Sequence, residues 1–257
     1  MILANYHTHT YRCGHADGED RAYIENAIRH GMQVLGFSDH CPFVFPDGYE
    51  SPIRMSLRQV DGYFTSLTKL RDEYKKDITI YIGFETEYLP ELIEEQDKLL
   101  ADYPVDYHIL GQHYLEREPY GEYVSVITDD EKLLEAYVER LIKGLETGRF
   151  VYAAHPDLVG FRGDAYQTQY TRLCKWLAEH DVPVEINLHG IVQRRHYTDP
   201  RFLQIAANAG CRAIIGCDAH TPSLLDDRSA VSDCETMAAK AGLPLVNFLP
   251  HLKPKHT

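Results

Sequence analysis

The sequence predicts a single α/β domain folded as a closed barrel of parallel strands, each followed by a helix. Three observations predict it. Short apolar runs alternate with helix-like stretches seven times along the 257 residues. The first run is not followed by the glycine-rich phosphate loop that is typical of open dinucleotide-binding sheets. Side chains able to bind metals follow the runs, and a closed barrel brings all its strand ends to one face.

The elements follow one another in regular order. The expected strands cover residues 2–6, 34–37, 78–84, 107–110, 151–154, 184–186 and 213–215. The expected helices cover residues 19–30, 56–76, 91–101, 130–147, 166–180, 200–209 and 227–241. In the fourth helix, Leu134, Tyr137 and Leu141 fall at helical spacing, between a start signal at Asp130 and a stop signal at Gly148. Because parallel strands need crossover connections, strand–helix units in series favour a parallel sheet.

The composition excludes several classes of function. The net charge is −13, from 26 Lys and Arg against 39 Asp and Glu, which argues against nucleic-acid binding because phosphate recognition depends on basic residues. No apolar run reaches the roughly 18–20 residues of a membrane span. The six cysteines are scattered and no signal peptide is evident, so we expect reduced thiols and a cytoplasmic location.

Fourteen histidines are unusual in so acidic a chain, and many of them lie at or just after the predicted strand ends. The candidates at these ends are His7, His9, His15, His40, Glu85, His113, His155, Asp218 and His220. In His-x-His and Asp-x-His, alternate strand residues share a face and can reach one cation. Mixed histidine and carboxylate ligands suit Zn, Fe or Mn, and nine candidates exceed the needs of one ion, so we expect two or three. His108 is expected to face away from this pocket.

The motifs resemble those of the polymerase-and-histidinol-phosphatase (PHP) family, and more narrowly its histidinol-phosphatase branch. The resemblance spans residues 1 to about 225 and rests on His7-Thr8-His9-Thr10, Cys13-Gly14-His15-Ala16, Phe37-Ser38-Asp39-His40, Gly83-Phe84-Glu85 and Asp218-Ala219-His220. It implies a distorted seven-stranded (β/α)7 TIM-like barrel formed by one domain, residues 1–257. It also implies three divalent ions: one held by His7, His9, Glu85 and Asp218, one by His15, His40 and His220, and one by His113 and His155 with Glu85 bridging.

The resemblance further implies hydrolysis of L-histidinol phosphate, a step of histidine biosynthesis, with a metal-bridging hydroxide as nucleophile. Glu85 and Asp218 are the expected catalytic carboxylates. Arg162 and Arg194 are the expected phosphate contacts, with Arg54 as a weaker choice, because a guanidinium pairs well with phosphate. His189 and His196, in the loop after the sixth strand, are further candidates for substrate contact.

Three alternatives remain open at the level of the sequence. The substrate could be another small phosphomonoester or a nucleotide. The domain could be a 3′–5′ exonuclease-type nucleic-acid module, although no basic track accompanies it. It could also bind metal without catalysis, although a complete ligand set favours an enzyme acting on a small phosphorylated substrate.

Overall fold

The protein is described from a computed structural model that covers residues 2–255. Five parallel strands form a curled sheet in the order β1 (Ala4–Asn5), β2 (Val34–His40), β3 (Thr79–Thr86), β4 (Tyr107–Leu110) and β6 (Phe150–Ala153). A second parallel sheet pairs β8 (Val184–Asn187) with β9 (Ala213–Gly216). A minor sheet pairs β5 (Ile127–Thr128) with β7 (Gly160–Phe161).

The seven predicted strands all occur, but not as one continuous barrel. A parallel bridge between Thr8 and Ala219 connects the ends of β1 and β9. No backbone ladder connects β6 with β8 within residues 2–255, and the side chain of Glu185 on β8 instead accepts a hydrogen bond from the backbone N–H of His155, at 2.7 Å. The observed fold is therefore an α/β structure with a curled five-stranded half-barrel.

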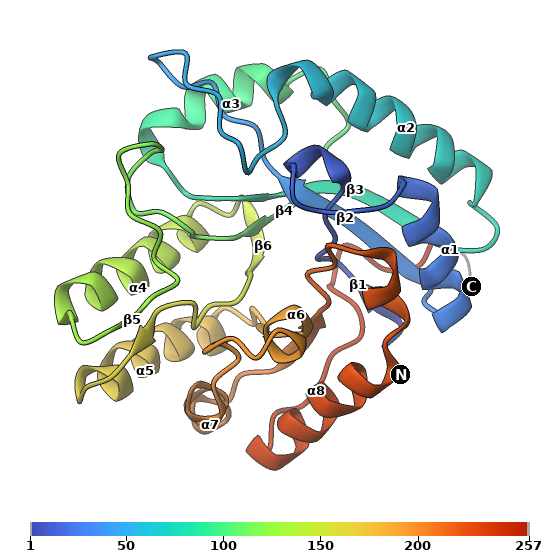
Figure 1. The fold of residues 1–257 in the computed structure, drawn as a ribbon. Helices are drawn as coiled ribbons and strands as arrows, with labels where there is room; N and C mark the ends of the chain where they lie inside the picture. The colour runs from blue at the N-terminus through green and yellow to red at the C-terminus, as the bar shows by residue number, and fades with distance from the viewer. Residues whose placement is uncertain (1, 256–257) are drawn as a thin grey trace.

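A ring of helices surrounds the strands in chain order (Figure 1). Its members are α1 (Asp20–His30), α2 (Val60–Glu73), α3 (Ile93–Leu100), α4 (Glu131–Glu146), α5 (Ala165–Glu179), α7 (Pro200–Ala209) and α8 (Arg228–Ala241). Each corresponds to a predicted helix. The short helix α6 (Leu188–Val192), which directly follows β8, was not predicted. None of the helices described has both the length and the apolarity needed to cross a membrane.

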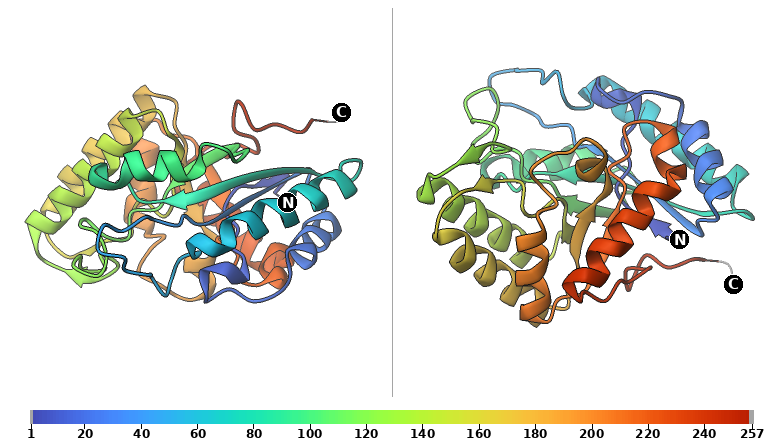
Figure 2. Two further views of the ribbon diagram at one scale, coloured as in Figure 1. Left: turned by 90° about the horizontal axis from the view of Figure 1, so that it is seen from above. Right: turned by 60° about the horizontal axis from the view of Figure 1, so that its bottom comes forward.

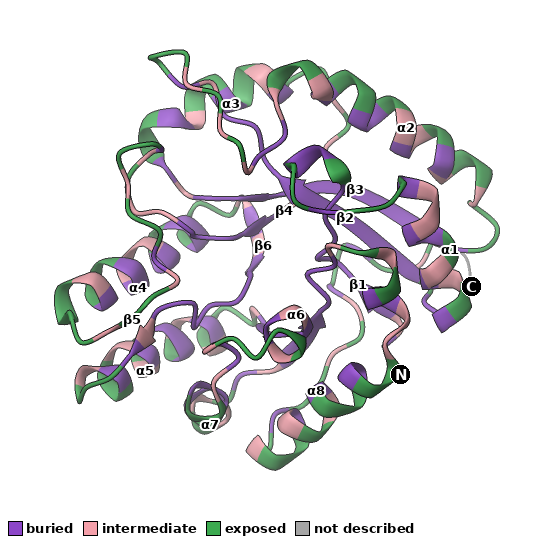
Figure 3. Ribbon diagram, viewed as in Figure 1, coloured by how far each residue is buried: buried purple, intermediate pink, exposed green. Residues whose placement is uncertain are grey.

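The helix ends follow from local sequence. Asp130 begins α4 by accepting hydrogen bonds from the N–H groups of Lys132 and Leu133, as acidic N-cap residues do. The helix α7 begins at Pro200 and ends at Gly210, whose φ of +86° suits glycine. The strands of the two larger sheets are almost entirely buried, the short strand β5 is partly exposed, and the helices expose one face (Figure 3). The main core lies between these two layers.

A separate apolar cluster fills the amino-terminal end of the strands. It contains Tyr6, Tyr107 and Tyr152 from the strands and Leu249 and Leu252 from the C-terminal tail. Tyr6 donates a hydrogen bond to the carbonyl of Leu252 at 2.5 Å. The tail runs apart from α8 (Figure 2). It closes the end of the barrel opposite to the one where the predicted ligands lie.

Candidate metal centre

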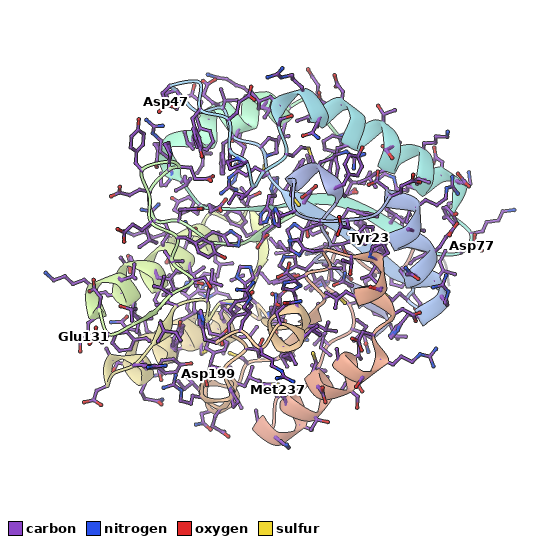
Figure 4. All side chains as sticks on the ribbon, in the orientation of Figure 1. Tyr23, Asp47, Asp77, Glu131, Asp199 and Met237 are labelled. Atoms are coloured by element: carbon purple, nitrogen blue, oxygen red, sulfur yellow. The ribbon has the colours of Figure 1, made fainter. Side chains whose placement is uncertain are left out.

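The carboxyl ends of the strands bring the nine predicted ligands together, and nitrogen-bearing side chains gather there in the middle of the ring (Figure 4). Glu85, on β3, is at the centre and is buried. Its carboxylate oxygens lie 2.9 Å from Nε2 of His155 and 3.1 Å from Nδ1 of His40. They lie 3.5–3.6 Å from Nε2 of His7, His9 and His113. One carboxylate therefore faces imidazoles from four different strand ends.

Asp218, after β9, forms the second acidic point of the site. Its Oδ1 lies 3.1 Å from Nε2 of His9 and 3.5 Å from Nε2 of His7. His15 completes the group at its outer edge, with its ring 4.8 Å from that of His220 and 5.2 Å from that of His40. The ligand atoms form overlapping groups within 4.8 Å of one another: His7–His9–Asp218, His7–Glu85–His155, His9–His40–Glu85 and His15–His40–His220.

The backbone is shaped to allow this convergence. His155 and Asp218 have φ values of +30° and +49°, a region that residues other than glycine rarely adopt and that is found where function holds a side chain in place. Gly111 is needed for a different reason. A Cβ at this position would lie 2.0 Å from Oε1 of Glu85, so any side chain there would displace the central carboxylate.

The buried carboxylates of the site favour the binding of cations. Burial would raise the pKa of Glu85, but the surrounding histidines hold it well below its ordinary value. Burial would lower the pKa of His7, but Asp218, Glu185 and Glu85 together raise it to about 10. Burial lowers the pKa of His40 well below 6.5. The carboxylates are thus ionised at neutral pH, and without metal part of their charge is balanced by protons on buried imidazoles.

Unpaired ring nitrogens show that the residues fit metal ions. Within the described chain, Nε2 of His7 and both ring nitrogens of His9 are buried without a hydrogen-bond partner. Buried polar atoms are nearly always paired in native proteins, and an ion-binding site is one reason for exceptions. Imidazole and carboxylate donors together suit Zn, Fe and Mn.

Oxygen acceptors behind the histidines set which nitrogen faces the centre. Glu185 lies 2.9 Å from Nδ1 of His7, and Glu87 lies 3.0 Å from Nδ1 of His113. The backbone carbonyls of Cys13 and Asp218 lie 3.0 Å from Nδ1 of His15 and His220. An acceptor at Nδ1 keeps the proton there and leaves the Nε2 lone pair for a cation.

A cavity of about 470 Å³ opens above this cluster. Besides seven of the nine candidates, its lining includes Ile53, Tyr114, Tyr123, Ser125, Leu158, His189, Arg195 and Tyr197. The guanidinium of Arg195 has no hydrogen-bond or ion-pair partner in the described chain. The cavity therefore offers one unpaired cationic side chain beside the cluster.

The arginines that the sequence predicted as phosphate contacts do not line this cavity. Arg162 and Arg194 are exposed and do not line the cavity. Arg194 has a φ of +52°, and this local turn places the next residue, Arg195, on the cavity side. Arg54 is buried and paired with two glutamates, Glu87 and Glu118. His189 lines the cavity as expected, and His108 does not. The expectation for His196 was wrong: it does not line the cavity, because its Nε2 is bonded to the backbone carbonyl of Leu158 at 2.7 Å.

Sequence reasoning also missed the carboxylates behind the ligands. Glu185 is fully buried in strand β8, between Val184 and Ile186, and a charged residue inside a buried strand is a usable signal. Glu87 lies two residues after Glu85, so both side chains point to the same side of β3. The spacing of Glu85 and Glu87 is therefore a second signal in the sequence for a supporting carboxylate.

The chain is similar to known proteins along most of its length. The PHP domain family matches residues 5–189. A Deinococcus radiodurans protein named "Probable histidinol-phosphatase" is 27% identical over 244 residues, covering 89% of this chain and 90% of its own. The Bacillus subtilis histidinol-phosphatase is 25% identical over 173 residues, covering 60% of this chain and 63% of its own. A Lactococcus lactis histidinol phosphate phosphatase, solved with zinc, L-histidinol and phosphate, has the same fold with a TM-score of 0.74 at 19% identity, covering 98% of each chain.

Proposed function

The chain belongs to the PHP domain family, and we propose that it is a metal-dependent phosphomonoesterase that hydrolyses L-histidinol phosphate to L-histidinol and phosphate. The observation that carries this proposal is the buried Glu85 carboxylate among imidazoles with unpaired nitrogens, below a cavity that holds an unpaired arginine. The named activity of the relatives supports the choice of substrate.

Three divalent ions of Zn, Fe or Mn are assigned to the centre. His7, His9, Glu85 and Asp218 hold the first. His15, His40 and His220 hold the second, and His113 and His155 share the third with Glu85. The overlapping ligand groups support more than one ion. When bound, such ions supply a water of lowered pKa and positive charge beside the phosphoryl oxygens.

Arg195 and Asp218 are assigned the roles of phosphate contact and charged ligand. Arg195 takes the phosphate-binding role, in place of Arg162 and Arg194, because it alone of the three lines the cavity. Burial would raise the pKa of Asp218, but His7 and His9 hold it well below the ordinary value. Asp218 is therefore unsuited to protonate the leaving alkoxide, and its role is that of a charged ligand beside the attacking water.

The proposal extends to the barrel that surrounds the site. The five-stranded sheet and the β8–β9 sheet together form one distorted seven-stranded barrel, which the Thr8–Ala219 bridge closes on one side and the Glu185–His155 hydrogen bond closes on the other.

The six cysteines are buried and free, in keeping with a reducing, cytoplasmic setting. The partner is a small phosphorylated molecule and not a nucleic acid.

The test is phosphate release from L-histidinol phosphate, sugar phosphates, nucleotides and an aryl phosphate, with elemental analysis of the same purified protein. We expect bound transition metal and a clear preference for L-histidinol phosphate. His9→Ala and Glu85→Gln should abolish turnover, whereas His108→Gln, a histidine outside the cavity, should preserve it. A preference for another substrate would overturn the proposed specificity, and full activity without bound metal would overturn the mechanism.

A further inference from the structure

A buried ion cluster lies directly behind His113, outside the group of predicted ligands. Arg54, from the loop after β2, donates two hydrogen bonds to Glu87 at 2.6 and 2.7 Å. Its Nε donates a third, at 2.5 Å, to Glu118 in the loop after β4. All three side chains are at most about 5% exposed. The cluster thus joins three chain segments at one side of the cavity.

The cluster carries more negative than positive charge. One guanidinium faces two carboxylates, and the only other side chains bonded to them among residues 2–255 are His113 and Ser51. Both carboxylate oxygens of Glu87 accept hydrogen bonds from the guanidinium of Arg54, so this carboxylate presents only acceptor oxygens to His113. A buried surplus charge is costly unless a cation lies nearby. His113 is the link between this surplus and the proposed metal centre.

The geometry at His113 defines that link. Its Nδ1 lies 3.0 Å from Oε1 of Glu87, and its Nε2 lies 3.6 Å from Oε1 of Glu85. Because both oxygens of Glu87 accept hydrogen bonds from Arg54, the proton between Glu87 and His113 belongs on Nδ1, and the lone pair of Nε2 is directed to the centre. The ring of Tyr123 is nearly parallel to the imidazole of His113, with the ring centroids 6.1 Å apart.

We propose that Glu87 is a positioning residue: anchored by Arg54, it holds His113 in the Nδ1-protonated form and thereby sets the affinity of the ion shared by His113 and His155. This inference rests on the proposed metal centre. In this proposal Arg54 supports the ligand His113 through Glu87 and does not bind the phosphate.

Glu118 provides a matched control. Glu118→Gln removes the same unit charge from the same cluster and from the same guanidinium, but it leaves the Glu87–His113 contact in place. Glu87→Gln keeps the shape of the side chain and removes the charge that fixes the imidazole proton. A general loss of stability would affect both variants, whereas positioning of His113 predicts a difference between them.

The experiment is a zinc titration of the chelator-stripped, full-length proteins against a chromophoric competitor, which needs no substrate. We expect Glu87→Gln to weaken one of the bound ions by about 10- to 100-fold, and Glu118→Gln to bind all ions within about threefold of the unaltered protein. Equal weakening in both variants, or none in Glu87→Gln, would overturn the inference. If the unaltered protein binds no zinc, the proposed function fails as well.

A second measurement does not depend on the folding of any variant. Nitrogen NMR of the unaltered, zinc-loaded protein reports which ring nitrogen of His113 carries the proton. We expect it on Nδ1. A proton on Nε2 would contradict the assignment even if the zinc titration favoured it.

Discussion

Oε1 of Glu185 lies 2.9 Å from Nδ1 of His7, and neither side chain is exposed to solvent. The other oxygen of Glu185 accepts a hydrogen bond from the backbone N–H of His155 at 2.7 Å. One carboxylate on β8 therefore orients a predicted ligand that follows β1 and fixes the backbone of another that follows β6. Barrel closure and ligand geometry depend on the same side chain.

We predict that Gly216→Ala will disrupt this arrangement. The new Cβ would lie 1.8 Å from Oε1 of Glu185, and Glu185 cannot move without losing its bonds to His7 and His155. Unfolding in urea should show a loss of about 1–3 kcal/mol, typical of overpacking, together with weaker metal binding. Gly62→Ala is the control, because its Cβ meets nothing within 4 Å on exposed α2. That variant should be as stable as the unaltered protein or up to about 1 kcal/mol more stable.

Replacement of Arg195 by Gln should reduce kcat/KM for the phosphomonoester by about 100-fold, because a charge-assisted contact to the phosphoryl oxygens is lost. Arg194→Gln, its exposed neighbour, should change kcat/KM by less than about threefold. Steady-state kinetics on both variants decide between the two positions. A larger effect at Arg194 would return the role to the residue that the sequence favoured.

The stability of the metal-free protein should depend on His108 in acid. Burial lowers the pKa of His108 to about 4, against 6.5 for the unperturbed side chain. Between these pH values the unfolded chain binds a proton that the native state does not, so the free energy of unfolding falls as the pH falls from 6.5 to 4. The full difference corresponds to about 3 kcal/mol.

His108→Gln removes this titration while keeping a polar partner for Thr86. Urea unfolding at pH 7 and pH 4.5 should show a smaller loss of stability in the variant than in the unaltered protein. Identical losses in the two proteins would contradict a buried, neutral His108.

Leu252→Ala should destabilise the protein without affecting the metal centre. Leu252 is buried against the tyrosines at the amino-terminal end of the strands, and truncation of a buried leucine costs about 2–5 kcal/mol. Lys253→Ala, at an exposed neighbouring position, should have little effect. Denaturation in urea and zinc titration of both variants test the two parts of this prediction separately.

Much of the fold could be predicted from the sequence because it depends on local patterns. Apolar runs and helical spacing located the seven strands and the seven long helices within a few residues. The histidines and carboxylates at the strand ends could be grouped because parallel strand ends meet at one face. The structure indeed brings Glu85 into contact with histidines that follow four different strands.

The remaining features depend on tertiary structure. Which of two adjacent arginines faces the cavity is decided by the left-handed backbone at Arg194. No backbone ladder joins β6 and β8 in the described chain, and Glu185 on β8 instead contacts His7 and His155, which are far away in the sequence. Arg54 and Glu118 are 64 residues apart, and neither lies within a periodic pattern that would connect them.

The position of the C-terminal tail has a consequence for the path of substrate and products. Leu249 and Leu252 belong to the apolar cluster at the amino-terminal end of the strands, so substrate is expected to reach the cavity beside Arg195 from the carboxyl ends of the strands. Both products are expected to leave on the same side. Inorganic phosphate keeps the group that Arg195 is proposed to bind. Phosphate should accordingly compete with the substrate as an inhibitor, so the rate would respond to the phosphate concentration around the enzyme.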